Sequence, residues 1–197
     1  MADSNRSDPH PLTVERIVDA ACLIIERDGL SGLSMRKLGT ELGVDPMAVY
    51  HHVAHKRELL ALVTKRTIGT MTPLDPSAPW EVRVRQWAIR YWDLVVAHRE
   101  LTLAGLADPE IAAGGRPSTE PLIAAVAESG LPTDLIEPNA FLVVDAVHGS
   151  ALAVGSLDRH DTGGHVDLRA AFDNGIDTIL AGITLLADAE SERTTRP

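Results

Sequence analysis

The chain has 197 residues, of which 45% are hydrophobic and 23% charged, a composition typical of soluble globular proteins and unlike that of fibrous or disordered chains. Its formal net charge of −10 by itself argues against a nucleic-acid partner. The single cysteine, Cys22, excludes an intramolecular disulfide, and the polar N-terminal segment does not resemble a signal peptide. We therefore expect a cytoplasmic protein.

The charge is unevenly distributed along the chain. Residues 1–66 carry nine Lys or Arg and nine Asp or Glu, whereas residues 67–197 carry nine and nineteen, so the second part holds the whole net charge of −10. The first part also contains all three lysines, Lys37, Lys56 and Lys65. This asymmetry indicates two parts with different partners, and the first part can meet a polyanion.

Apolar residues recur at helical spacing along most of the chain, and no strictly alternating segment predicts a strand. The first helix begins after the N-cap Thr13, carries Cys22 as a small residue on its apolar face, and ends at Gly29. Shorter helices are expected at 35–43 and 47–52 and from Lys56 onward. Polar or proline-rich breaks are expected at 1–12, 72–79 and 158–167.

Residues 34–53 thus predict a helix, a glycine turn and a second helix. Each helix has only about two turns, too few for stability in isolation, so both must pack on the first helix. Three helices with a glycine turn between the last two form a helix-turn-helix arrangement, whose final helix enters the DNA major groove. The residues spaced to form a small core between the short helices are Leu38, Leu42, Val44, Val49 and Val53.

The second part predicts longer helices, at 80–98, 118–130, 138–157 and 168–188. The helix at 138–157 has only one full charge, Asp145, and is long enough to cross a membrane. Its other polar residues, Asn139 and His148, and its many small residues favour instead a helix buried in a soluble protein. We therefore expect no membrane association.

The segment from Leu33 to Val63, LSMRKLGTELGVDPMAVYHHVAHKRELLALV, resembles the DNA-binding domain of the tetracycline-repressor (TetR) family. The resemblance extends over residues 13–63 and is looser beyond, where His98-Arg99 and residues 172–183 are the most similar pieces. It implies an all-α fold with a flexible tail at 1–12, an N-terminal three-helix helix-turn-helix DNA-binding domain at 13–55, and a C-terminal helical ligand-binding and dimerisation domain at 56–197.

The resemblance also assigns DNA contacts. Pro46, Met47 and Ala48 begin the recognition helix and face base edges, where apolar side chains can touch a thymine methyl but cannot hydrogen-bond to a base. Tyr50 and Lys56 match phosphate-binding positions. The other expected DNA-binding residues are Arg36, Lys37, His51 and His52.

Simpler roles exist for several of these residues. Tyr50 fits a core aromatic as well as a phosphate contact, and Arg36 and Lys37 fit a solvated helix face. His51 and His55 are four residues apart on a helix, a spacing that suits a metal. Because no acidic or cysteine ligand lies beside them in the sequence, we expect no metal site.

Four of the seven aromatic residues lie within thirteen positions, and three of them, Trp80, Trp87 and Tyr91, share one helix face. This face is either core packing or the wall of a ligand pocket. In the second case Asp145 and His148 supply the polar contacts to the ligand. An equal alternative is that these two residues hydrogen-bond to each other in the core. The expected ligand-binding residues are Trp87, Tyr91, Phe141, Asp145 and His148.

A second copy of the chain is the other expected partner, because one short helix reads only a few base pairs. Small residues on the last two helices allow close approach of two copies. The expected interface residues are Gly149, Ala153, Gly175, Thr178 and Gly182.

Together these features predict a ligand-responsive transcriptional repressor, released from a pseudo-palindromic double-stranded operator by a small apolar or aromatic inducer. No phosphate-binding loop, G-x-S-x-G or H-E-x-x-H motif is present, so we expect neither an enzyme nor a cofactor. The alternatives are a helical small-molecule carrier or enzyme without DNA binding, and a helical dimer that has lost DNA binding.

Overall fold

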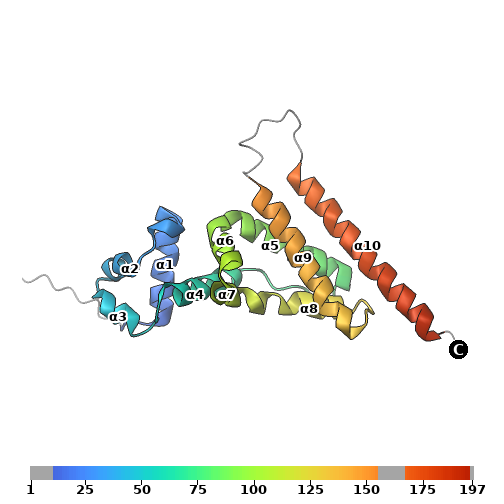
Figure 1. Ribbon diagram of the computed structural model, residues 1–197, viewed down its shortest axis with the longest axis horizontal. Coiled ribbons are helices and arrows are strands. Elements are labelled where there is room, and N and C mark those ends of the chain that lie inside the picture. The colour runs from blue at the N-terminus through green and yellow to red at the C-terminus, as the bar shows by residue number, and fades with distance from the viewer. Residues whose placement is uncertain (1–10, 155–166, 196–197) are drawn as a thin grey trace, which may run out of the picture. The chain divides into compact units, whose positions relative to one another are not determined.

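The computed structural model describes residues 11–154 and 167–195, and these are helical with no strand, as predicted (Figure 1). They fall into two compact units. The first contains the chain up to Gly69 together with Glu100–Arg116, and the second contains Thr70–Arg99 and the chain from Pro117 onward. A segment from the middle of the sequence therefore belongs to the N-terminal unit.

The first unit begins with α1 (Val14–Asp28), the 3-10 turn η1 (Leu30–Gly32), α2 (Met35–Leu42), α3 (Pro46–Tyr50) and α4 (Lys56–Ile68). The expected N-cap Thr13 is confirmed, and two further side chains cap α2 and α3 in the same way. Thr13, Ser34 and Asp45 each accept a hydrogen bond from a backbone N–H in the first turn of α1, α2 and α3. Gly43, with φ of 68°, ends α2 in the left-handed region that favours glycine.

The predicted small core is also confirmed. Leu38, Val49 and Val53 are fully buried, and Leu42 and Val44 pack against the same cluster. This cluster also contains Leu59, Leu60 and Val63 of α4. Because these side chains pack with α1, α4 lies in the first unit, and this division differs from the boundary expected between residues 55 and 56.

Three elements that were not predicted from sequence complete the first unit: α6 (Arg99–Ala107), α7 (Pro109–Ala112) and η2 (Ala113–Ser118). Leu101 and Ile111 are buried in the cluster described above. The carboxylate of Glu100 accepts a hydrogen bond of 2.7 Å from the backbone N–H of Leu30. Arg57 of α4 lies 3.4 Å from the Glu110 carboxylate. The segment is thus bound both to the α1–α2 connection and to α4.

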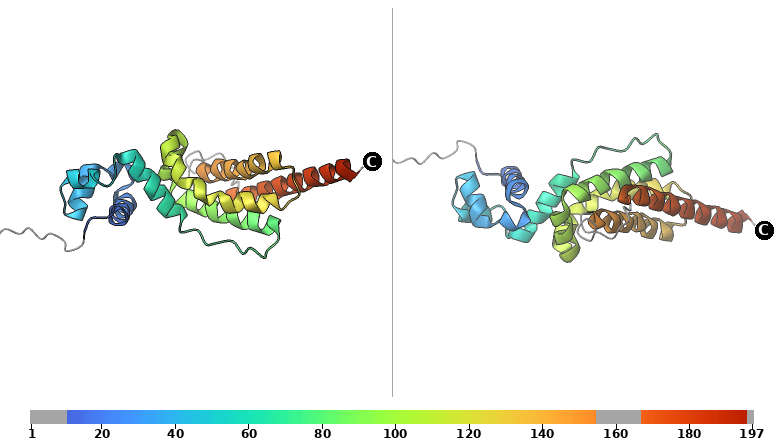
Figure 2. Two further views of the ribbon diagram at one scale, coloured as in Figure 1. Left: turned by 90° about the horizontal axis from the view of Figure 1, so that it is seen from below. Right: turned by 90° about the horizontal axis from the view of Figure 1, so that it is seen from above.

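The second unit consists of α5 (Trp80–Ala97), α8 (Glu120–Ala127), α9 (Thr133–Ala153) and α10 (Leu168–Thr195). Helix α5 packs on α8 and α9, and α9 packs on α10, as Figure 2 shows. Trp87, Val143 and Ile176 are among the buried residues of this core. Helix α9 begins five residues earlier than expected, and α10 continues beyond residue 188. Residues 158–166 of the expected break, and the last three residues of the helix expected at 138–157, lie outside the described residues.

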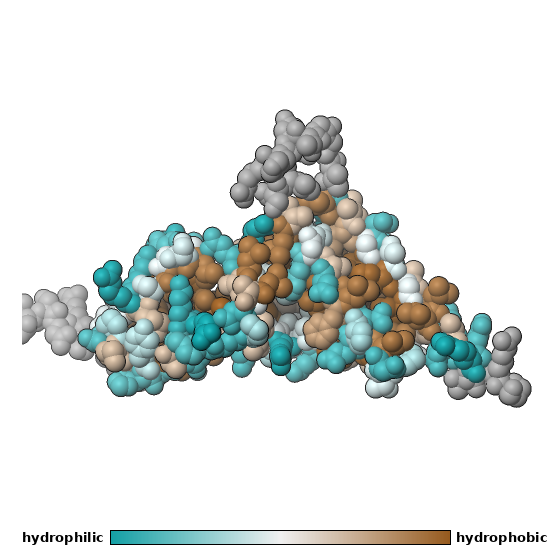
Figure 3. Space-filling model, in the orientation of Figure 1, coloured by the Kyte–Doolittle hydropathy of each residue, from teal (hydrophilic) through white to brown (hydrophobic). Residues whose placement is uncertain are grey.

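Helix α9 was expected to be a buried helix that also carries interface residues, and within a single copy of the chain only one side of it is buried. Val143, Val144 and Val147 face the core, whereas Phe141 and Leu142 are exposed. Apolar residues gather over α9 and α10 on the face seen in Figure 3. Within the described residues, Leu168–Arg193 is long and apolar enough to cross a membrane by length and composition, a test that core helices of soluble proteins also pass.

Gly114 offers a test of the packing of the α6–η2 segment. A Cβ at this position would overlap the backbone carbonyl of Ala61 in α4, so we expect Gly114→Ala to destabilise the protein by about 2 kcal/mol. Gly105→Ala is the control, because its Cβ would meet only ordinary van der Waals contacts with the backbone of Ala112 in α7, and the substitution should stabilise α6 by up to about 1 kcal/mol. Urea denaturation measures both, and equal effects would contradict the close packing of α4 against this segment.

Candidate nucleic-acid interface and polar site of the helical bundle

Helix α3 turns one buried residue inward and most others outward. Val49 is fully buried and anchors the helix, whereas Met47 is 61% exposed and Tyr50 42% exposed. His51 and His52, at the end of the helix, are exposed as well, and Pro46 and Ala48 are half-buried. Tyr50 is therefore not a core aromatic, and the predicted recognition residues of α3 form one accessible surface.

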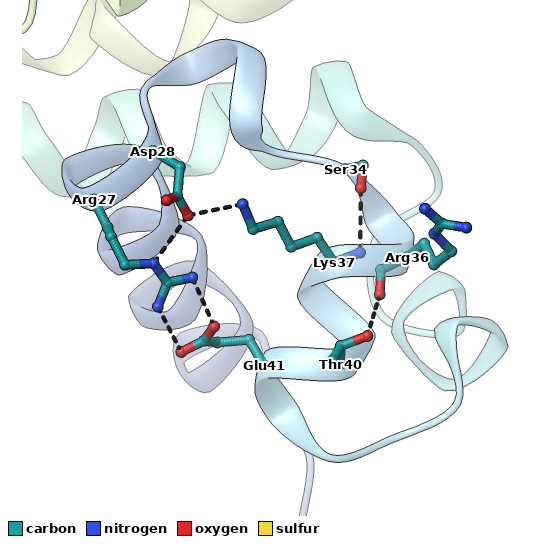
Figure 4. A network of polar contacts seen from close by, with 7 residues as sticks. All are labelled: Arg27, Asp28, Ser34, Arg36, Lys37, Thr40 and Glu41. Carbon is teal, nitrogen blue, oxygen red and sulfur yellow. Dashed lines mark hydrogen bonds and ion pairs between the residues drawn. The ribbon is translucent and has the colours of Figure 1, made fainter.

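The basic residues of α1 and α2 differ in how their charges are paired (Figure 4). Arg27 binds Glu41 at 3.0 Å and Asp28 at 2.9 Å, and the Lys37 amine lies 2.8 Å from the same Asp28 carboxylate. The guanidinium of Arg36 projects away from this network (Figure 4) and has no partner among the residues that the structure describes. Arg36 is thus available for an external anion or base edge, whereas Lys37 ties α2 to α1.

Lys56 has a contact that the sequence did not predict. Its amine donates a hydrogen bond of 2.7 Å to the carbonyl of Leu33, just before α2, so it ties the start of α4 to α2. Two of its three N–H groups remain for a phosphate. The neighbouring His55 is the N-cap of α4, because its Nδ1 accepts from the backbone N–H of Glu58. In the described parts of the chain, no group of three or more His, Cys, Asp or Glu fits a metal ion.

The structure brings together three of the five expected ligand-binding residues. The rings of Trp87 and Tyr91 lie 4.7 Å apart, and the Tyr91 hydroxyl lies 2.8 Å from Nε2 of His148 on α9. Burial raises the pKa of Tyr91 to about 12. Burial also lowers the pKa of His148, and the nearby charge of Asp145 partly opposes this shift. Tyr91 and His148 thus form a neutral pair at neutral pH.

The other two expected ligand-binding residues lie elsewhere on α9. Phe141 is 44% exposed and Asp145 is also exposed, so neither lies in the core with Trp87, which is only 2% exposed. The Trp87 indole donates a hydrogen bond to the carbonyl of Ser118. Trp87 is therefore a core residue. The polar groups next to it are those of the hydrogen-bonded pair Tyr91 and His148.

The five expected interface residues lie on accessible parts of α9 and α10. A Cβ at Gly149, Gly175 or Gly182 would meet no atom within 4 Å, Thr178 is exposed and Ala153 half-buried. Apolar side chains accompany them on these helices. Those exposed by more than 40% are Phe141, Leu142, Leu185 and Leu186.

The N-terminal helices are similar in sequence to a known family of bacterial regulators. A family model described as bacterial regulatory proteins, tetR family, matches residues 17–63, which include all of α2 and α3. Residues 17–63 are thus similar to the DNA-binding region of the TetR family, and solved structures of that family share the fold of the chain. Its relatives are regulators and not enzymes, which agrees with the expectation from sequence.

Two curated relatives and one solved structure illustrate the extent of the similarity. The transcriptional repressor DrrR1 of Streptomyces coeruleorubidus is 48% identical over 59 residues, or 29% of this chain and only 22% of that protein. The transcriptional regulator Rv0681 of Mycobacterium tuberculosis is 28% identical over 78% of this chain and 76% of its own. The TetR family protein ActR of Streptomyces coelicolor, crystallised with (S)-DNPA, is 25% identical with a TM-score of 0.73, covering 90% of this chain and 100% of that chain.

The burial of Tyr91 predicts that one of the tyrosines ionises at an unusually high pH. The chain has two tyrosines, and the hydroxyl of Tyr91 should ionise near pH 12 instead of 10.0. Between these values the unfolded chain loses the proton and the folded one keeps it, so stability should fall as the pH rises. Ultraviolet absorbance of tyrosinate measures the titration, and Tyr91→Phe should remove the step near pH 12. Persistence of that step in Tyr91→Phe would contradict the assignment.

Proposed function

We propose that this protein is a cytoplasmic repressor of the TetR family that binds a pseudo-palindromic operator as a homodimer and is released by a small apolar or aromatic molecule. The observation that carries the proposal is the accessible surface of α3 beside the unpaired guanidinium of Arg36. The named function of DrrR1 as a repressor and the complex of ActR with (S)-DNPA support the two halves of the proposal.

In this proposal the two helices make different kinds of contact with the bases. Arg36 on α2 can form two hydrogen bonds to guanine O6 and N7, the commonest specific contact in the major groove. Met47 and Ala48 on α3 can contact thymine methyl groups but provide no hydrogen bonds to bases. Tyr50 and Lys56 then contact phosphates and fix the position of the unit, without reading sequence. In this proposal Arg36 supplies most of the hydrogen-bonded sequence readout.

A homodimer supplies the second half-site. The accessible sides of α9 and α10 carry apolar residues and glycines whose missing side chains allow helices to approach closely. Four helices, two from each copy, would bury this surface around a two-fold axis. The two copies of α3 would then read half-sites in successive major grooves.

We propose that a change on α5 reaches α2 through α6, which follows α5 directly in the chain. Helix α6 begins at Arg99, two residues after α5 ends, and its Glu100 holds the backbone N–H of Leu30 before α2. A ligand that binds beside Tyr91 on α5 acts only through its difference in affinity between the two states. Two ligands that each contribute under ~3 kcal/mol can shift a dimer from 1:99 to 99:1, which needs about 5.5 kcal/mol.

The pairing of charges predicts different consequences for neighbouring basic residues. Arg36→Ala should weaken operator binding at least about tenfold and relax the preference at one base pair, because a bidentate contact is worth about 1–3 kcal/mol. Lys37→Ala should cost less, because Asp28 already holds its amine. Lys65→Ala, at the far end of α4, is the control. Gel-shift titrations measure the three affinities, and a larger loss for Lys37→Ala than for Arg36→Ala would refute the assignment.

The proposed dimer surface has its own test. Gly182→Glu should place a charge without a partner in the seam and produce monomers. Thr184→Glu is the control, because Thr184 lies on the acidic side of α10 with Asp177 and Asp188. Sedimentation velocity distinguishes the two variants, and an unchanged dimer in Gly182→Glu would exclude this surface from the interface.

A further inference from the structure

The first turn of α4 is capped by an unusual residue, a histidine. Nδ1 of His55 accepts a hydrogen bond of 3.2 Å from the backbone N–H of Glu58, and the carboxylate of Glu58 accepts one of 2.6 Å from the backbone N–H of Ala54. The residues preferred at this position, Ser, Thr, Asp and Asn, cap a helix with an oxygen atom that remains an acceptor in mild acid. An imidazole does not, because it gains a proton between about pH 8 and pH 5.

The hydrogen bond from Glu58 requires the neutral form of His55. An imidazole nitrogen accepts only where it carries no proton, so the proton of the neutral ring lies on Nε2. That nitrogen is 3.4 Å from a carboxylate oxygen of Glu110 on α7. Protonation adds a proton to Nδ1, which abolishes the cap but keeps the attraction to Glu110. A positive charge at the N-terminus of a helix is also unfavourable. The ring therefore holds the first turn of α4 only while it is uncharged.

Charged groups from α4 and α7 lie around His55. The other carboxylate oxygen of Glu110 is 3.4 Å from Arg57 of α4, and Arg57 is 3.7 Å from Asp108 at the start of α7. The carboxylate of Glu110 is thus shared between His55 and Arg57. Because Arg57 already pairs with this carboxylate, the first turn of α4 remains bound to α7 whether His55 is charged or neutral.

Two further imidazoles, His51 and His52, are exposed at the end of α3. When they are protonated, their positive charges strengthen binding to any DNA, whatever its sequence. An ion pair between α4 and α1, Arg66 with Asp19 at 3.0 Å, lies about three helical turns from His55. A test of His55 therefore has to compare proteins that differ only at that residue.

The cap precedes a residue that the proposed function places on a phosphate. The amine of Lys56 donates a hydrogen bond of 2.7 Å to the carbonyl of Leu33, the residue before the N-cap of α2. Loss of the His55 cap leaves the first turn of α4 free to fray, since one of its backbone N–H groups loses its partner. The phosphate contact of Lys56 and its link to α2, which carries Arg36, then weaken together.

We infer that His55 is a positioning residue for operator binding, which makes the DNA affinity of the protein sensitive to acid. The neutral imidazole holds the first turn of α4 where Lys56 and Arg36 can contact DNA, and the protonated imidazole releases it. This inference rests on the proposed function and adds to it a response that needs no small-molecule effector.

His55→Asn separates the cap from its charge, because asparagine is a strong N-cap that does not titrate. Fluorescence anisotropy measures the affinity of each full-length protein for a duplex that the wild-type protein selects from a random pool at pH 8. At pH 8 His55→Asn should bind like the wild type, whereas His55→Ala should bind about fivefold more weakly, the equivalent of one lost cap. From pH 8 to pH 5.5, the affinity of the wild type relative to that of His55→Asn should fall about fivefold.

A second pair of proteins controls for the neighbouring imidazoles. The same comparison in proteins that also carry His52→Asn should give the same fall, because His52 lies outside the cap of α4. Circular dichroism at each pH verifies that every protein is folded. If His55→Asn does not fold, His55→Ser replaces it, since serine caps helices about as well.

Two results would overturn the inference. Parallel pH profiles of the wild type and His55→Asn would mean that the cap does not control binding. A relative gain of affinity by the wild type in acid would mean that protonated His55 binds a phosphate directly. Either result would leave the proposed repressor function intact, whereas selection of no duplex by the wild-type protein would refute the proposed function and the inference together.

Discussion

The surface proposed to read DNA depends on one packing constraint, which is that α2 and α3 cannot be stable by themselves. They contain eight and five residues, too few to offset the cost of helix nucleation in water. Leu38 and Val49 therefore fix their positions by burial in a cluster that α1 and α4 complete. Each such side chain contributes roughly 1.5–3 kcal/mol when fully buried. The exposed residues of α3 keep their positions only because Val49 is buried in this cluster.

The same constraint explains why the N-terminal unit is discontinuous in sequence. The segment Glu100–Arg116 adds Leu101 and Ile111 to the cluster and binds the α1–α2 connection through Glu100. Its charged contacts with Arg57 reach the first turn of α4, close to Lys56. A displacement of this segment would therefore act on α2 and α4 together. This coupling suits a protein whose DNA affinity responds to events on α5, to which the segment is directly connected.

Local features of the first unit could be predicted from sequence because they depend on neighbouring residues. Caps at Thr13, Ser34 and Asp45 and the turn at Gly43 follow from residue chemistry within three or four positions. Helices α6 and α7 were missed because short helices show little periodicity, and α7 has only four residues.

Pairings between distant residues could not be predicted in the same way. The Lys56 contact with Leu33 spans 23 residues and the Glu100 contact with Leu30 spans 70, so only the fold brings these groups together. The exposure of Phe141 also could not be predicted from sequence. Its helix is apolar all round in sequence, and only the packing of α9 on α5, α8 and α10 decides that Phe141 is exposed while Val143 is buried.

Selection from a random pool of duplex DNA by the full-length protein tests whether Arg36 and α3 read a two-fold symmetric operator. We expect enrichment of a pseudo-palindrome with two half-sites in successive major grooves, each containing a guanine whose enrichment disappears when the Arg36→Ala variant is used. Recovery of sequences without two-fold symmetry, or the same guanine preference with Arg36→Ala, would contradict this expectation.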